Sequence, residues 1–138
     1  MKNFISAWLP VFMWTLVIFL FSSLSSVETP FLIWWDVLIK KTAHLIEYAI
    51  LAILLFRALR MTYENRKSQS SLLQMSGILS SLYAVSDEIH QGFTPGRTPT
   101  VRDVIIDIIG ITLALFLVKK LNEQKKKIPL LSEFIFEE

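Results

Sequence analysis

Four long apolar runs constrain the fold of this chain more than any other feature. They cover residues 4–21, 42–59, 72–89 and 101–121. Each run is close to the ~20 apolar residues that cross the hydrocarbon core of a bilayer as a helix. None shows the period-two alternation of a half-buried strand. The sequence therefore predicts an all-α fold, an integral membrane bundle of four transmembrane helices.

Composition agrees with a membrane protein. Of 138 residues, 53% are hydrophobic and only 19% are charged, whereas soluble domains average about 25% charged residues. Cysteine is absent, which excludes a disulfide framework, a thiolate metal site and a thiol nucleophile. The length suits one domain, and we expect a four-helix domain over 1–121 and a cytoplasmic lysine-rich tail over 122–138. With a formal net charge of only +2, we expect no nucleic-acid partner.

The first apolar run has two interpretations, a secretory signal peptide or a retained membrane helix. Only Lys2 precedes it, and the run is longer than the ~7–15 residues of a signal-peptide core. No clear small-x-small cleavage site follows within Ser22–Ser26. A retained helix is therefore expected, with Pro10 tolerated if a neighbour satisfies the carbonyl that the proline leaves without a donor.

The basic residues are distributed unevenly between the loops. If the N-terminus is cytoplasmic, ten Lys and Arg residues fall on the cytoplasmic side and four on the other, namely Lys40, Lys41, Arg97 and Arg102. Loops rich in Lys and Arg stay in the cytoplasm. This bias predicts a multi-pass protein of the cell membrane with both termini cytoplasmic, and with the 22–41 and 91–100 loops facing outward.

This topology would gather most of the polar residues near the outer leaflet. The second and fourth helices would start there, and the third would end there. Charge inside or beside a membrane is costly and usually has a function or a partner. The candidate site residues are Lys41, His44, Glu47, Tyr48, Asp87, Glu88, His90, Gln91, Arg97, Asp103 and Asp107.

Local patterns add detail to this end of the bundle. Thr100 is predicted as the N-cap of the fourth helix, with Asp103 at the acidic position of a capping box. Pro95-Gly96 predicts a tight turn in which the glycine has a positive φ. On the fourth helix Gly110 and Ala114 share the face of Asp107, and small residues at this spacing let another helix approach closely. Gly77 and Ser81 could do the same on the third helix.

A resemblance to a known family rests on two blocks and three single positions. The blocks are Lys41-Thr-Ala-His44-Leu-Ile-Glu47-Tyr48 and Tyr83-x-x-x-Asp87-Glu88-x-His90-Gln91-x-Phe93-x-Pro95-Gly96-Arg97, and the positions are Asp103, Asp107 and Gly110. With these residues the chain resembles the VanZ-like family of small integral membrane proteins. The resemblance implies a four-helix membrane protein and a link to teicoplanin resistance in Gram-positive bacteria. It does not supply a biochemical mechanism.

The first functional hypothesis is a recognition site at the outer leaflet. Its ligand would be a membrane lipid head group, a lipid-linked cell-wall precursor or a glycopeptide antibiotic. Lys41 and Arg97 would meet phosphate, the arginine in bidentate fashion. Carboxylates would hold these cations and accept hydrogen bonds from sugar or peptide groups. The binding residues would be Lys41, Glu47, Tyr48, His90, Gln91, Arg97, Asp103 and Asp107.

The second hypothesis is a membrane-embedded enzyme, a hydrolase or transferase that acts on an envelope lipid or precursor. Asp87 or Glu88 would be the main acid and His44 its partner. These side chains are also types that ligate divalent metals, although their spacing matches no metal motif and no cofactor is expected.

A third interpretation is structural, with the polar residues forming a network that holds the helices together. Such contacts contribute only about 0.6 kcal/mol each. A transporter fits poorly, because the acids lie at one face and no inverted repeat is visible. Oligomeric state is not predicted.

Overall fold

The computed structural model describes residues 2–24, 33–63 and 66–123, which form helices joined by turns and loops and contain no strand. Four helices follow one another in this described part of the chain: α1 (Lys2–Ser22), α2 (Ile33–Tyr63), α3 (Gln69–Gln91) and α4 (Val101–Glu123). The predicted all-α class and number of helices are therefore confirmed. Two segments, Phe4–Ser22 and Lys41–Tyr63, are long and apolar enough to span a membrane. Spans by α3 and α4, and the cytoplasmic location of the termini, stay predictions.

Two segment boundaries differ from those predicted. The 22–41 segment was expected to be a loop, but α2 already begins at Ile33. No glycine or proline occurs between residues 33 and 63, so nothing breaks the helix where the long apolar run begins. The predicted tail at 122–138 lies outside the described residues, except that α4 continues to Glu123.

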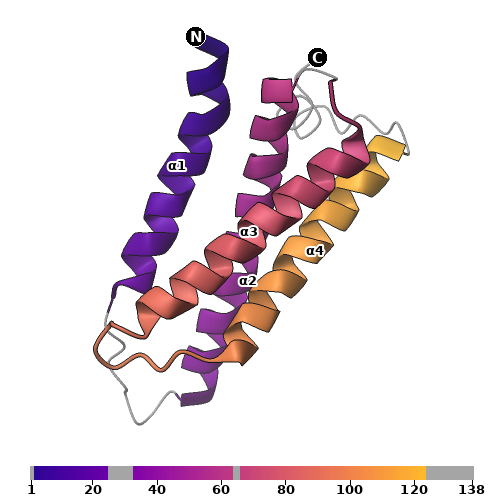
Figure 1. Ribbon diagram of the computed structural model, residues 1–138. Coiled ribbons are helices and arrows are strands. Elements are labelled where there is room, and N and C mark those ends of the chain that lie inside the picture. The colour runs from indigo at the N-terminus through magenta and orange to yellow at the C-terminus, as the bar shows by residue number, and fades with distance from the viewer. Residues whose placement is uncertain (1, 25–32, 64–65, 124–138) are drawn as a thin grey trace.

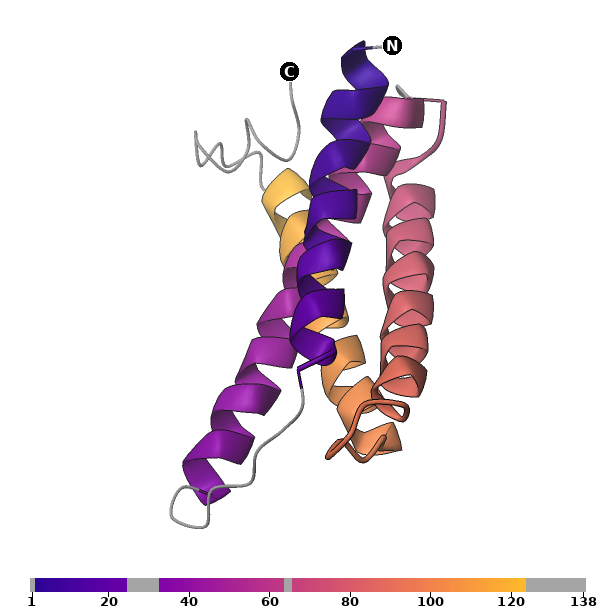
Figure 2. The same cartoon turned by 90° about the vertical axis from the view of Figure 1, so that its left-hand side faces the viewer.

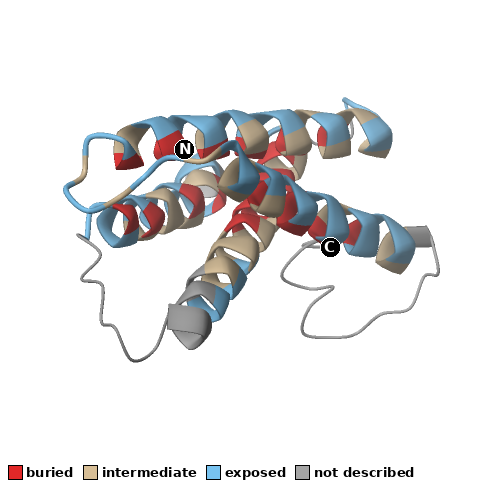
Figure 3. Cartoon of the chain, turned by 90° about the horizontal axis from the view of Figure 1, so that it is seen from below, coloured by how far each residue is buried: buried red, intermediate tan, exposed pale blue. Residues whose placement is uncertain are grey.

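The helices run up and down, with α2 at the centre (Figures 1 and 2). α2 contacts each of the other three helices, and its contact with α4 is the most extensive. Its middle is accordingly buried, including Tyr48, Leu51, Phe56 and Leu59. Figure 3 shows the buried residues facing inward between the helices and the exposed ones outward.

The outer surface of the bundle is also apolar. Phe12 on α1, Leu82 on α3 and Leu117 on α4 are each more than half exposed. A helix that is apolar on all sides belongs in the interior of a large protein or in a membrane. The exterior therefore has the character of a surface that contacts hydrocarbon.

The contact between α2 and α4 depends on Gly110. A Cβ atom at this position would collide with the main-chain carbonyl oxygen of Leu45 on α2. Ala114, one turn further along α4, is also buried. The close approach predicted from Gly110 and Ala114 is therefore confirmed. Gly77 differs, because a Cβ atom there would meet only the Leu115 Cδ1 atom, at 3.3 Å.

α1 stays helical through Pro10 because α2 supplies a missing donor. Proline has no N–H, so the carbonyl four residues earlier, that of Ser6, loses its intrahelical partner. The buried Arg57 on α2 donates from Nη1 to this carbonyl oxygen at 3.2 Å. A neighbouring helix thus satisfies the backbone as predicted for a proline in a membrane helix.

The two glycines should respond differently to alanine. We expect Gly110→Ala to lower the free energy of unfolding by about 1–3 kcal/mol, the usual cost of overpacking, because the opposing atom is main chain. Gly77→Ala should be neutral or stabilising, since Leu115 can rotate and alanine favours a helix by about 1 kcal/mol. Chemical unfolding of both variants in detergent measures this. Equal effects would contradict the assigned contact.

The arginine and the proline should be energetically coupled. Arg57→Met should destabilise the protein by about 1–3 kcal/mol, part of it from the Ser6 carbonyl left without a donor. In a Pro10→Ala background, residue 10 donates to that carbonyl itself, so the same substitution should cost less. A double-mutant cycle on unfolding free energies measures the coupling. Strict additivity would show that Arg57 does not serve this carbonyl.

Candidate functional site

The structure brings the predicted site residues together at one end of the bundle. This end holds the last turns of α1 and α3, the first turns of α4 and the part of α2 that passes them (Figure 1). Within it the residues separate into two groups. One group has well-defined structural partners, and the other contains buried polar atoms without them.

Glu88 caps the neighbouring helix α4. The backbone N–H of Thr100 donates to Glu88 Oε1 at 2.5 Å, and the Asp103 N–H donates to Thr100 Oγ1 at 3.3 Å. Thr100 is thus the N-cap, as predicted. The acid that completes the capping box is Glu88 of α3, whereas the sequence predicted Asp103 in this role. Asp103 instead accepts a hydrogen bond from Lys41 Nζ at 2.9 Å and so links α4 to α2.

Arg97 ties the loop after α3 to the end of α1. Its Nη2 donates to the Phe21 carbonyl at 3.1 Å and its Nε to the Leu24 carbonyl at 3.3 Å. Carbonyls at a helix C-terminus lack intrahelical donors, and a cation there also interacts favourably with the negative end of the helix dipole. Nη1 donates to Gln91 Oε1 at 3.3 Å. The turn that presents Arg97 contains Gly96 with a φ of 77°, as the Pro95-Gly96 pair predicted.

His90 also lies against the end of α1. Its Nε2 is 3.1 Å from Ser23 Oγ, a hydrogen-bond distance. Its ring stacks on Phe19 with the ring centroids 4.6 Å apart. His90 therefore joins α3 to α1, and the structure does not place it among the buried acids.

The second group forms what we call the inner polar cluster: His44, Tyr48, Asp87, Gln91 and Asp107. Gln91 Nε2 donates to Asp87 Oδ2 at 3.0 Å within α3. His44 Nδ1 on α2 faces Asp107 Oδ1 on α4 at 3.8 Å, which is too long for a hydrogen bond. Asp87 interacts electrostatically with both His44 and Tyr48. Three helices thus contribute to one cluster.

Several atoms of this cluster lack partners. Within the described part of the chain, His44 Nδ1, Tyr48 Oη and Asp107 Oδ1 are buried and make no well-formed hydrogen bond, although the Asp87 side chain is close enough to interact with the Tyr48 hydroxyl. A buried polar group without a partner costs about 1–3 kcal/mol. Such groups in native proteins usually have a bound water, an ion or a functional role. The cluster is therefore the part of this end that could hold a polar ligand.

Two residues of α1 near the cluster were not predicted. Ser22 is buried, and its hydroxyl has no partner among the described residues. Trp14 donates from its indole N–H to the Glu47 carbonyl at 2.9 Å. Trp14, the buried Ile18 and Ser22 are spaced by four residues, so the helical period could have placed Ser22 on the inner face.

A metal site finds no support in this geometry. Over residues 2–24, 33–63 and 66–123, no group of three or more His, Asp and Glu side chains is placed to hold a metal ion.

Glu88 and Asp103, the two acids near Thr100, should contribute differently to the free energy of unfolding. Glu88→Ala should lower the free energy of unfolding by about 1–2 kcal/mol, because the start of α4 loses a cap. Glu88→Gln keeps an acceptor and should cost less. Asp103→Ala breaks an ion pair that is about one third exposed, worth at most about 1 kcal/mol. Chemical unfolding checks the order, and a larger loss for Asp103→Ala would contradict the cap from α3.

Comparison with known proteins agrees with the resemblance drawn from the motifs. No curated protein and no solved structure matches the chain. The protein-family model described as VanZ/LLP1 matches residues 5–122, a range that contains every residue of the inner polar cluster. The chain belongs to the VanZ/LLP1 family.

Proposed function

We propose that this protein spans the membrane four times with both termini in the cytoplasm, and that its inner polar cluster recognises the head group of a lipid. The ligand class is a lipid-linked cell-envelope precursor or a membrane lipid. The observation that carries the proposal is the set of unpartnered buried atoms on His44, Tyr48 and Asp107. They belong to two helices and lie beside Asp87 and Gln91 of a third.

The chemistry of the cluster suits a ligand rich in hydroxyl and amide groups. Asp87 and Asp107 accept hydrogen bonds, and the Tyr48 hydroxyl can donate or accept. At the rim, Arg97 and Lys41 supply positive charge for a phosphate. The three bonds of Arg97 described above use three of the five donors of a guanidinium, so the group can contact an anion as well as the α1 carbonyls.

The link to antibiotic resistance rests on the family. Teicoplanin is a lipid-tailed glycopeptide, and the family's named member is linked to resistance to it. A protein that holds a cell-wall precursor or the antibiotic at the outer leaflet would change how the two meet. We extend this role to the present chain as part of the proposal.

One observation favours an enzyme as the second candidate. Asp107 is buried beside His44 Nδ1 at 3.8 Å, and a buried acid next to a histidine is how many general bases are oriented. In this version His44 would act on the head group with Asp87 or Glu88. The ligand class is the same, so one experiment can separate the two candidates.

Two tyrosines provide a matched test. The Tyr83 hydroxyl donates to the Thr15 carbonyl at 2.8 Å, whereas the Tyr48 hydroxyl makes no well-formed hydrogen bond within the described residues and lies near the Asp87 side chain. Tyr48→Phe should leave the unfolding free energy unchanged or raised, but should reduce lipid retained through purification by about tenfold. Tyr83→Phe should lose about 1 kcal/mol of stability and keep the lipid. Native mass spectrometry and chemical unfolding of the full-length protein measure both.

The outcomes distinguish the interpretations. If Tyr48→Phe keeps its lipid and unfolds as easily as Tyr83→Phe, the cluster is structural and the proposal is wrong. If the lipid recovered from the wild type is chemically altered, and is intact in His44→Gln, the protein is an enzyme.

A further inference from the structure

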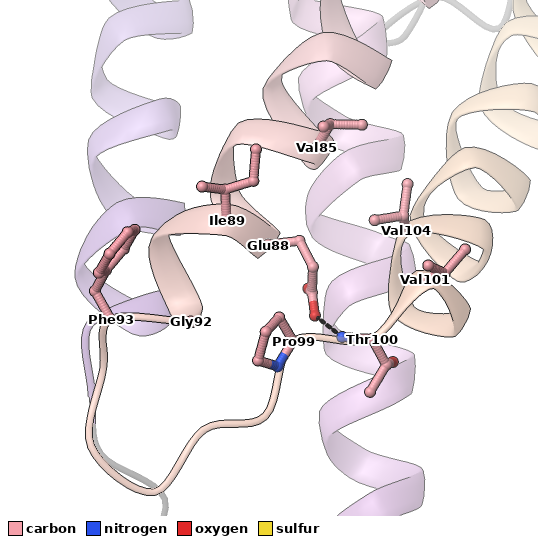
Figure 4. A pocket seen from close by; sticks show the side chains of 9 residues that line it. All are labelled: Val85, Glu88, Ile89, Gly92, Phe93, Pro99, Thr100, Val101 and Val104. Carbon is pink, nitrogen blue, oxygen red and sulfur yellow. Dashed lines mark hydrogen bonds between the residues drawn. The ribbon is translucent and has the colours of Figure 1, made fainter.

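A second surface feature lies next to the inner polar cluster. The end of α3, the 92–100 loop and the start of α4 enclose a groove of about 410 Å³ (Figure 4). Cavities that bind small ligands have volumes of about 300–1,000 Å³. The walls of the groove are apolar, formed by Val85, Ile89, Phe93, Pro99, Val101 and Val104.

The floor of the groove contains one charged group, which is already engaged. Glu88 lies there with its carboxylate turned to the backbone N–H of Thr100 (Figure 4). Gly92 keeps the loop close, since a Cβ atom at this position would lie 3.3 Å from Pro99 Cγ. The groove thus offers mainly hydrocarbon contacts, with a satisfied polar floor.

The groove is continuous with the apolar exterior of two helices. Leu82, Val85 and Ile89 follow one another along the exposed face of α3. At the rim, Phe93 is 82% exposed and Val101 is 78% exposed. Such large apolar side chains are stable in this position if they contact hydrocarbon. Continuity with these surfaces indicates that the occupant comes from the bilayer.

The groove and the inner polar cluster meet on a single turn of α3. Asp87 belongs to the cluster and the next residue, Glu88, belongs to the floor of the groove. Consecutive helical residues point about 100° apart, so the two sites lie on adjacent sides of α3. A lipid with its head group at the cluster could therefore place a chain along the groove.

We propose that this groove binds one hydrocarbon chain of the lipid whose head group the inner polar cluster recognises. The inference rests on the proposed function and adds a second contact that selects lipids by their chain. The inner polar cluster binds the head group, and the groove binds the hydrocarbon chain beside the end of α3.

The test uses full-length protein in nanodiscs with a phosphatidylglycerol that carries a photoreactive diazirine on one acyl chain. Cross-linked peptides are mapped by mass spectrometry. Labelling should concentrate on the lining residues above the level at Ile78, which lies further along the same exposed face of α3 and does not line the groove. Val104→Phe, which fills the groove, should reduce this labelling by about tenfold.

Ile105→Phe is the matched control, because it adds the same ring one residue along α4, at an exposed position outside the groove. It should leave the labelling unchanged. If Val104→Phe fails to fold, Val85→Phe narrows the groove from its exposed wall. Equal labelling at Ile78 and in the groove would overturn the inference.

The two proposals can fail separately. If groove labelling is absent while lipid retention still depends on Tyr48, the groove assignment is wrong and the head-group site stands. If groove labelling persists while retention ignores Tyr48→Phe, the head-group proposal is wrong and the groove is a chain site of another kind.

Discussion

The need to give every buried polar group a partner inside an apolar bundle governs this structure. An apolar interior offers no water to an unpaired carbonyl, so the protein must supply each donor itself. Arg57 serves the carbonyl that Pro10 leaves open in α1. Arg97 donates to the Phe21 carbonyl at the end of the same helix, and Glu88 accepts from the N–H of Thr100, the N-cap of α4. Against this background, the unpartnered atoms of Tyr48 and its neighbours are exceptions that call for a ligand or water.

The close contact of α2 and α4 determines where the unpartnered atoms of the inner polar cluster lie. Gly110 admits the main chain of Leu45, the residue that follows His44. Asp107 lies one turn before Gly110 on the same face of α4. Because Gly110 has no side chain, α2 and α4 approach closely enough to place His44 Nδ1 3.8 Å from Asp107 Oδ1. Lys41 and Asp103 bridge the same two helices one turn further out. The small residue that lets α2 and α4 pack closely therefore also positions the site residues on these two helices.

The sequence predicted what depends on local pattern. Apolar runs gave the four helices, Thr100 was recognisable as an N-cap, and Gly110 as a close-contact residue. It did not predict which partner each polar residue takes, because that depends on distances between helices. Asp103 occupied the right position for a capping box, yet Lys41 engages it and Glu88 takes its place. The start of α2 was also missed, since amphipathic turns before an apolar run leave no sharp signal.

The 92–100 loop connects the two surfaces on which the function is proposed to depend. Arg97 in this loop bonds to Gln91, which bonds to Asp87, so one set of contacts leads from the loop to the inner polar cluster. Thr100 bonds to Glu88 on the floor of the groove, so a second set leads there. Both sets end on the last turn of α3. A head group that draws Arg97 toward its phosphate would therefore act on the same short loop that forms one wall of the groove. The loop and the last turn of α3 are therefore shared by both surfaces.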